Sequence, residues 1–383
     1  MALHFDRREY GERIRKVIGA LEQQGLDGLL MFNQESMYYL TGYDTFGFCF
    51  FQCLYLGTDG KLALLTRAPD LRQAQHTSII EDIRIWTDVA GAKPAGQLND
   101  MIIDLGGRGK KLGIEANAYG LSHANGKAVE EALANTCALT EASTLVSTIR
   151  LVKSPAELNY VRKAGKLGDL ALQAAIGVAK AGADEGKILA AQHAAIFAGG
   201  GDYPGNEFII GSGRDALLCR YKSGRRKLSK RDQLTLEFAG VYRHYHAAFM
   251  RTLIIGKPTK HHVKMEKAAR AALSAVEKLL RPGHSAGEIF DAHARIMDEH
   301  GMQKHRMNAC GYSLGAKFTP TWMDFPMFYH GNPVKIEANQ VFFAHMILMD
   351  SDSGNAYCLG RTYIIMRDKP EPVSKHSLAM IVR

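Results

Sequence analysis

The sequence has no apolar run long enough to cross a membrane, and its first residues lack the apolar core of a signal peptide. We therefore expect a cytoplasmic protein without a membrane partner. Its six cysteines are scattered and form no C-x-x-C pair, so we expect them to be reduced and mostly buried. Repeats and low-complexity segments are absent as well, which leaves an ordinary globular protein.

Positive charge is in moderate excess, with 48 Lys and Arg against 39 Asp and Glu, a net charge of +9. The run KSGRRKLSKR (Lys222–Arg231) holds six of these cations. Neither a recognition helix, a zinc finger nor an RNA-stacking motif accompanies the run, so we interpret it as a solvated loop and predict no nucleic-acid partner. A net positive field suits small anionic substrates.

A length of 383 residues exceeds one ordinary hydrophobic core and predicts two domains. In the first part, apolar strands such as GLLMF, CLYLG, KLALLTR and DIRIW alternate with helical stretches, which predicts an α/β domain over residues 1–150. Ser154, Pro155 and Glu157 then form the start signal of a long helix, with a capping box and a proline in the first turn. A second domain is expected over residues 151–383.

The second domain has long helical patterns followed or separated by hydrophobic strands. The helices are expected over residues 155–180, 185–198, 262–280 and 285–300. The strands QLTLEFAGVY, RTLIIG, QVFFAHMILM and RTYIIM are placed so that several pair directly, without helical crossovers. This pattern predicts an α+β domain, with helices packed on one face of a curved, largely antiparallel sheet.

Two polar residues interrupt otherwise apolar strands: Glu237 in LTLEFAG and His345 in VFFAHMILM. Each must be paired or functional. The histidine could make a hydrogen bond in the core, and the glutamate could form a buried salt bridge to Arg251 or Arg361. Alternatively, the two side chains converge on one cavity, where a carboxylate and an imidazole can perform nucleophilic or acid–base chemistry.

Several motifs occur in the order seen in one superfamily: SPAELNYVRKAGKLGDLAL, PGHSAGEI, GYSLG, QVFFAHM and LGRTYII. Together they resemble the catalytic domain of the creatinase, prolidase and aminopeptidase P superfamily, and the preceding α/β domain resembles its creatinase-like N-terminal domain. The resemblance implies the pita-bread fold, an active site in the second domain and a homodimer.

Peptidases of this superfamily bind two metal ions through five side chains. The resemblance places these positions at Glu237, Ala248, Tyr312, His345 and approximately Gly360. Alanine and glycine offer no side-chain donor, so the resemblance implies a metal-free branch without a cofactor, as creatinase is. A mononuclear zinc site made by Glu237, His345 and His246 is the alternative.

A narrower resemblance rests on LEFAGVYRHYHAAFMRT, CGYSLG and VFFAHMILMDSDSG, which are similar to segments of the metal-independent ectoine hydrolases. It implies hydrolysis of a non-peptide C–N bond in a small zwitterionic or amidine metabolite, namely ring opening of the cyclic amidine ectoine to N-acetyl-2,4-diaminobutyrate. The expected catalytic residues are Glu237, His345, Tyr312 and His246. The expected substrate-binding residues are Arg220, Tyr221, His244, Trp322, Asp324 and Arg361.

The apolar stretch TGYDTFGFCFF (Thr41–Phe51) is expected to pack at a protein interface. The resemblance implies that Tyr43, Asp44 or Phe46 closes the active site of the partner subunit in a homodimer. Other functions remain open: a creatinase-like amidinohydrolase, although Met250 stands where creatinase has a glutamate, a peptidase of the Xaa-Pro aminopeptidase or prolidase type, and a non-catalytic binding module.

Overall fold

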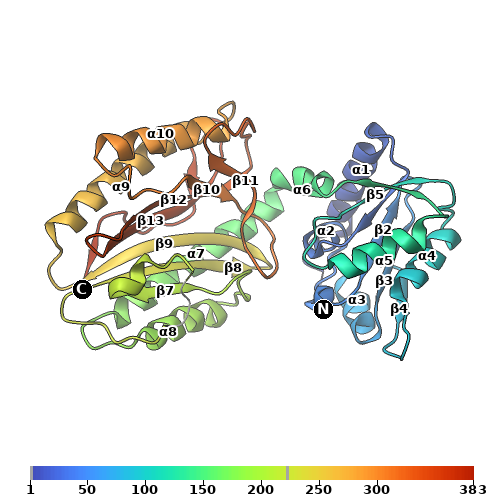
Figure 1. Ribbon diagram of the computed structural model, residues 1–383, viewed down its shortest axis with the longest axis horizontal. Helices are drawn as coiled ribbons and strands as arrows, with labels where there is room; N and C mark the ends of the chain where they lie inside the picture. The colour runs from blue at the N-terminus through green and yellow to red at the C-terminus, as the bar shows by residue number, and fades with distance from the viewer. Residues whose placement is uncertain (1–2, 221–223) are drawn as a thin grey trace. The chain divides into compact units, whose positions relative to one another are not determined.

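The computed structural model describes residues 3–220 and 224–383. The chain divides into two compact units, Met1–Arg150 and Leu151–Arg383, and each is described by itself (Figure 1). In the described residues, no helix is both long and apolar enough to span a membrane.

Unit 1 is built around a mixed sheet with the strand order β4-β3-β2-β1-β5-β6. The strands are β1 (Gly28–Met31), β2 (Cys53–Gly57), β3 (Leu62–Arg67), β4 (Asp82–Trp86), β5 (Lys111–Ile114) and β6 (Ala138–Glu141). The helices are α1 (Arg7–Gln23), α2 (Gln34–Thr41), α3 (Leu71–Thr77), α4 (Pro94–Asp104), α5 (His123–Leu133) and α6 (Thr144–Leu151), with short 3-10 turns η1 (Gly47–Cys49) and η2 (Ala68–Asp70).

The sheet of unit 1 is mixed because β1 pairs antiparallel with β2 and parallel with β5. Consecutive residues of β1 enter two different hydrophobic clusters: Leu29 and Met31 lie in one, and Leu30 in the other. Since side chains alternate along a strand, both faces of this sheet are buried. The α/β domain predicted from the alternating elements is confirmed.

Unit 2 contains a larger sheet with the order β11-β10-β12-β13-β9-β8-β7, to which two short strands add at β13 and β9. Its strands are β7 (Ile209–Ser212), β8 (Asp232–Tyr242), β9 (Tyr245–Ile255), β10 (Ala309–Ser313), β11 (Asp324–Tyr329), β12 (Val341–Asp350), β13 (Asn355–Ile364), β14 (Glu371–Pro372) and β15 (Ile381–Val382). Apart from β15, which runs parallel to β9, the neighbouring strands of this sheet are antiparallel.

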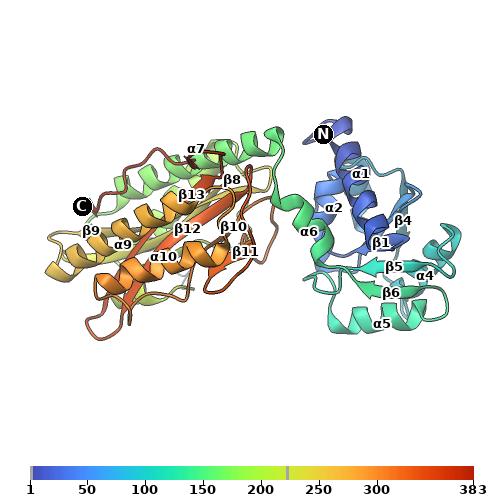
Figure 2. The same cartoon turned by 90° about the horizontal axis from the view of Figure 1, so that it is seen from above.

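The helices of unit 2 pack against this sheet, with α7 on β8 and β9 and with α9 on β12 and β13 (Figures 1 and 2). They are α7 (Pro155–Val178), α8 (Glu185–Ala198), α9 (Lys260–Leu279) and α10 (Ala286–Glu299), and a 3-10 turn, η3, spans Gly213–Leu217. Ser154 and Glu157 cap α7 with the predicted capping box. A side chain at Gly240 would lie 1.9 Å from the carbonyl oxygen of Ala164, so glycine permits the close approach of α7 and β8.

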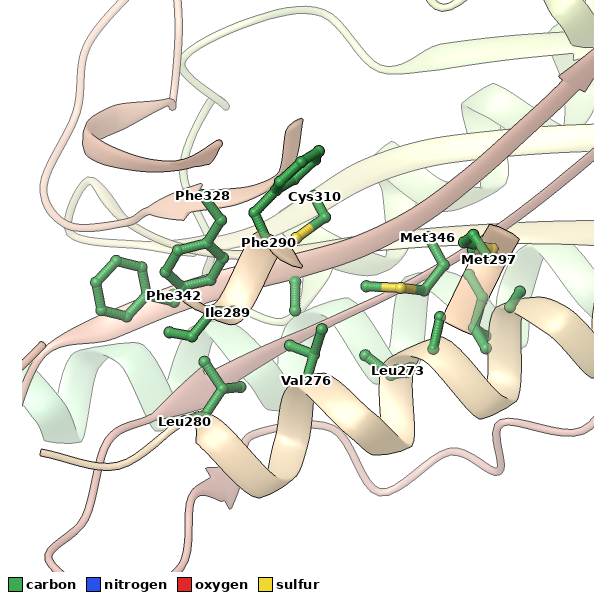
Figure 3. Close-up of a cluster of buried hydrophobic side chains, with 14 of the residues drawn as sticks. Leu273, Val276, Leu280, Ile289, Phe290, Met297, Cys310, Phe328, Phe342 and Met346 are labelled. Carbon is green, nitrogen blue, oxygen red and sulfur yellow. The ribbon is translucent and has the colours of Figure 1, made fainter. Parts of the chain in front are cut away.

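An apolar cluster of unit 2 lies between α9, α10 and the sheet (Figure 3). Val276 of α9 and the following C-cap residue Leu280, together with Ile289 of α10, pack near Phe342 and Met346 of β12. The predicted architecture of helices against a largely antiparallel sheet is therefore confirmed. The strand predicted at RTLIIG is longer than expected, because β9 begins at Tyr245 and includes the residues that precede Arg251.

Candidate active site

Neighbouring strands of unit 2 bring Glu237 and His345 into one row across the sheet. Glu237 of β8 lies opposite Met250 of β9, Met250 lies opposite Gly360 of β13, and Gly360 lies opposite His345 of β12. Residues directly opposite each other in antiparallel strands point to the same face. We call the face that carries this row the site face. The opposite face, which α7 and α9 cover, is the helix face.

Tyr312 and Trp322 join Glu237 in a directed chain of hydrogen bonds. The Trp322 indole N–H donates to the Tyr312 hydroxyl at 2.9 Å, and this hydroxyl donates to Glu237 Oε1 at 3.3 Å. Because an indole nitrogen can only donate, the phenolic proton must point away from Trp322, toward the carboxylate. Trp322, expected as a substrate-binding residue, is buried, so it positions Tyr312 from inside the protein.

Burial dominates the electrostatics of Glu237. It raises the pKa of this carboxyl group to about 7, against the hydrogen bond from Tyr312 and the positive charge of Arg220, which both lower it. A carboxyl group with this pKa exists in both protonation states near neutral pH. Glu237 can therefore accept a proton and return it during one reaction cycle.

His345 lies beside Tyr312, with ring centroids 5.6 Å apart. Burial lowers the pKa of His345 to about 4, so its imidazole is neutral at physiological pH. Among the described residues, its Nδ1 has no hydrogen-bond partner. The structure therefore brings three of the predicted catalytic residues together on the site face: Glu237, Tyr312 and His345.

His246 also points to the site face. It is four residues before Met250 on β9, and residues an even number apart on a strand point to the same face. Its Nε2 accepts a hydrogen bond of 2.8 Å from the backbone N–H of Gly205, so the proton of the neutral ring is on Nδ1. Burial, with a smaller effect of the nearby His244, lowers the pKa of His246 to about 3. His246 is thus a fixed neutral imidazole and a poor general acid.

Two loops are held together beside this cluster. The backbone N–H of Trp322 donates to Asn206 Oδ1 at 3.2 Å, next to the contact between Gly205 and His246. A side chain at Gly205 would lie 2.9 Å from the Trp322 backbone nitrogen, so the two loops approach closely only because residue 205 is glycine. The position of Trp322 therefore depends on the loop around residues 205–206.

Arg220 follows η3 and is exposed, and its charge acts on both Glu237 and Tyr312. A guanidinium is suited to hold an anionic group of a ligand, because it can donate two parallel hydrogen bonds. Tyr221, the other substrate residue expected in this segment, lies outside the described residues.

The structure corrects the expectation for Arg361, because this side chain lies on the helix face. Its Nη2 donates to the His376 carbonyl oxygen at 2.6 Å, and its Nη1 is 4.0 Å from Oε1 of Glu277 in α9. Arg251 of β9 lies opposite Leu359, two residues before Arg361 on β13, and therefore on the same face. Its Nη1 donates to the Met250 carbonyl oxygen. The alternative of a buried salt bridge from Glu237 to Arg251 or Arg361 is therefore wrong.

His244 lies at one end of the β8–β9 ladder, and Asp324 lies at the start of β11. His244 is at the turn between β8 and β9, where its ring stacks on Phe318 with centroids 4.1 Å apart, about 16 Å along the ladder from Glu237. Asp324 begins β11, and its carboxylate lies beside Gly315, as does the Lys153 amine.

The expectation for Tyr43 is also corrected. Tyr43 is fully buried in the core of unit 1, and its hydroxyl lies 3.3 Å from Gln52 Oε1 and 3.2 Å from Thr66 Oγ1, so it cannot reach a partner subunit. Asp44 is partly buried, and its backbone contacts Thr77 and Gln73. Phe46 is 81% exposed and remains available for an interface.

Comparison with known proteins places this chain in a family. The model of metallopeptidase family M24 matches residues 159–365, which is more than half of the chain. The chain belongs to metallopeptidase family M24. The model of the creatinase/prolidase N-terminal domain matches residues 13–152. The predicted superfamily is confirmed, and with it the two-domain fold.

Individual relatives of family M24 differ in their described activities. The ectoine hydrolase of Halomonas elongata is 27% identical over 338 residues, which cover 84% of each chain. An uncharacterized hydrolase/peptidase of Sinorhizobium fredii is 29% identical over 331 residues, again 84% of each chain. The prolidase structure from Thermococcus sibiricus has a TM-score of 0.87 at 19% identity and covers 98% of this chain and 99% of that one, which establishes the fold.

The residues at the metal positions of family M24 do not fit a metal ion in this chain. The described residues hold no group of three or more His, Cys, Asp or Glu side chains that could bind one. A side chain at Gly360 would lie 2.5 Å from the Phe343 ring and 2.9 Å from Met250 Cβ, so apolar groups occupy the space beside the row. Carbon atoms in place of oxygen donors do not bind hard divalent cations.

Phe343 is the main site residue that the sequence analysis missed. It lies two residues before His345 and therefore on the same face, with ring centroids 5.5 Å from both His345 and Tyr312. The alternation along β12 contained this signal. Asn206, by contrast, lies in a loop between α8 and β7, and the sequence around it predicts no contact with Trp322.

Proposed function

We propose that this member of family M24 is a metal-independent hydrolase that opens the ring of the cyclic amidine ectoine to N-acetyl-2,4-diaminobutyrate. The observation that carries the proposal is the chain from Trp322 through Tyr312 to Glu237, in which a buried carboxylate is held by one directed donor beside an apolar surface. The ectoine hydrolase of Halomonas elongata, at 27% identity, supports the choice of substrate.

The chemistry of ectoine matches these groups. Its amidinium carries a positive charge that pairs with the Glu237 carboxylate, and the pairing lowers the pKa of that carboxyl group in the complex. Its methyl group and ring edge suit the apolar surface of Phe343 and Met250. Its carboxylate suits a guanidinium, and Arg220 is the one whose charge acts at Glu237.

In the proposed reaction, Glu237 removes a proton from a water molecule, and the oxygen adds to the central amidinium carbon. The resulting tetrahedral species breaks one of its two C–N bonds. The nitrogen that leaves receives the proton held by Glu237, and the hydroxyl proton of the tetrahedral species then passes to the released amine. The products are an acetamide and an ammonium group, and the Glu237 carboxylate is restored. Direct attack of Glu237 on the same carbon, with release of the amine and addition of water to the resulting imidate ester, expels the carboxylate and reaches the same products. His345 is neutral and lies beside Tyr312, where it can orient the substrate by a hydrogen bond.

The test uses protein that has been stripped of metal by exhaustive chelation, with its metal content measured by mass spectrometry. Ectoine, creatine and an Xaa-Pro dipeptide are incubated separately with the protein, and the products are identified by mass spectrometry. We expect N-acetyl-2,4-diaminobutyrate from ectoine alone. Cleavage of the dipeptide that requires added metal would instead identify a peptidase, and cleavage of creatine an amidinohydrolase. If none of these compounds is turned over, the proposed hydrolase activity is wrong, and the result favours a non-catalytic binding module.

A further inference from the structure

A separate cavity of about 530 Å³ lies at one end of the sheet in unit 2. Gln233 of β8 lines it and points to the same face as Glu237, four residues or about 13 Å farther along the strand. The buried Thr235 lies between these two residues and bonds across to Thr252. The cavity is therefore distinct from the candidate active site.

Three cations from different segments line this cavity: Arg214 of η3, Arg231 immediately before β8, and Lys257 between β9 and α9. All three side chains are exposed, and within residues 3–220 and 224–383 none forms an ion pair or a side-chain hydrogen bond. Asp232 also lines the cavity, but its carboxylate is bound by Arg226 at 2.5 Å and by the Ser229 N–H at 2.7 Å. The lining thus presents three cations that have no ion-pair partner in the described part of the chain.

Gln233 lines the cavity and connects several segments around it by hydrogen bonds. It is buried, and its Nε2 donates to the carbonyl oxygens of Gly213 at 2.7 Å and Gly354 at 2.8 Å. Its Oε1 lies 2.8 Å from both the Ala356 N–H and His262 Nε2. One side chain therefore ties η3, the turn between β12 and β13, and the first turn of α9 to β8. A ligand in this cavity meets cations whose backbone positions are already set.

We propose that this cavity binds a small metabolite with one or more phosphate groups. Several cations around one cavity favour a ligand with at least two negative charges, and the guanidinium groups of Arg214 and Arg231 can each donate two parallel hydrogen bonds to phosphate oxygens. The N-terminus of α9, a helix of 20 residues capped by Thr259, adds partial positive charge at the same cavity. This inference goes beyond the proposed function and does not depend on it.

The proposal is tested by isothermal titration calorimetry with pyrophosphate at constant ionic strength. The proteins are the wild type, the double variant Arg214→Gln/Arg231→Gln, the single variant Lys257→Gln, and the control Lys180→Gln/Lys304→Gln, which removes two exposed cations elsewhere in unit 2. We expect one site per chain in the wild type. The double variant should bind at least about tenfold more weakly, and the control within about twofold of the wild type.

Two results would overturn the proposal: wild-type protein that binds no pyrophosphate at millimolar concentration, or a control variant weakened as much as the double variant. The melting temperature of each variant without ligand verifies that it folds. If the double variant does not fold, Lys257→Gln decides. Severalfold weaker binding in that variant supports the site, and unchanged binding contradicts it.

Discussion

The hydroxyl of Tyr312 lies 3.3 Å from Oε1 of Glu237 and donates its proton to it. Tyr312 is on β10 and Glu237 is on β8, and three strands separate these two in the order of the sheet. Four strand spacings of about 4.8 Å are too far for these two side chains to bridge in a flat sheet, so their contact requires the sheet to curve toward the site face. The hydrogen bond stabilises the charged form of a carboxylate that burial otherwise keeps protonated.

Replacement of the carboxylate tests its chemical role. We expect Glu237→Gln to abolish ectoine hydrolysis, because the amide keeps the shape but neither accepts a proton nor attacks carbon. The free energy of unfolding should change by less than about 1 kcal/mol, since the one cation whose charge acts on Glu237 among the described residues, Arg220, is exposed to water and is not left as a buried unpaired charge. Turnover and thermal unfolding are measured together, with the exposed Glu299→Gln as the control. A folded Glu237→Gln enzyme with near-normal turnover would exclude Glu237 from the mechanism.

The hydrogen bond from Tyr312 should be visible in the pH dependence of the rate. Removal of the hydroxyl in Tyr312→Phe destabilises the Glu237 carboxylate, so its pKa rises above about 7. Because the reaction needs the carboxylate, the acidic limb of the kcat/KM profile should move to higher pH, by about one unit. Trp322→Phe should move it less, in the same direction, because it only weakens the donor. The exposed Tyr203→Phe is the control, and a profile unchanged in Tyr312→Phe contradicts the assignment.

The packing of Phe343 on Gly360 predicts opposite effects for two glycine-to-alanine changes in unit 2. At Gly360 a methyl group meets the Phe343 ring at 2.5 Å, so Gly360→Ala should destabilise the protein by about 1–3 kcal/mol. At Gly177 in α7, nothing lies within 4 Å of the added methyl group, so Gly177→Ala should stabilise by about 0.5–1 kcal/mol. Urea unfolding measures both changes. Equal stability of the two variants would show that the space beside Gly360 is open.

The buried His293 of α10 should lower the free energy of unfolding in acid. Burial lowers its pKa to about 3, and neither ring nitrogen has a hydrogen-bond partner among the described residues. Between the unfolded-state pKa of about 6.5 and the folded-state value, the unfolded chain binds a proton that the folded protein does not. The contribution of His293 to the free energy of unfolding is therefore complete above pH 6.5. It is lost as the pH falls, by about 1.4 kcal/mol per pH unit.

The variant His293→Leu isolates this effect, because it removes the titrating ring and keeps an apolar side chain of similar size. Its free energy of unfolding relative to the wild type should increase steadily as the pH is lowered from 6.5 to 4. Urea titrations at each pH measure the difference. A difference that does not change with pH would mean that the histidine is protonated in the folded state.

We propose that the protein forms a homodimer through the surface around Phe46. Phe46 is 81% exposed and the neighbouring Phe50 is 41% exposed, which is unusual for large apolar side chains outside an interface. Phe46→Ser should weaken the dimer at least about tenfold, as expected when a large aromatic anchor is removed from an interface. The matched control is Tyr119→Ser, at another exposed aromatic residue of unit 1. Sedimentation velocity over a dilution series measures both. A wild-type protein that is monomeric at micromolar concentration would contradict the proposal.

Local patterns in the sequence determined the elements, because helix caps and strand alternation depend on neighbouring residues. Ser154 and Glu157 predicted the start of α7, and the apolar period along LTLEFAGVY predicted β8 with Glu237 as its unusual member. Resemblance added the superfamily and the loss of donors at Ala248 and Gly360. None of these observations depends on how distant strands are aligned.

The tertiary structure alone decided which polar groups share a face and what each one bonds. A shift of one residue in strand register moves every side chain to the other face, and register is set by long-range pairing that a single sequence does not display. Arg361 and His345 illustrate this: both were expected at the site, but the pairing of β12 with β13 aligns His345 with Gly360 and places Arg361 against α9. The same long-range packing brings the Trp322 indole to the Tyr312 hydroxyl, and thereby directs the Tyr312 proton toward Glu237.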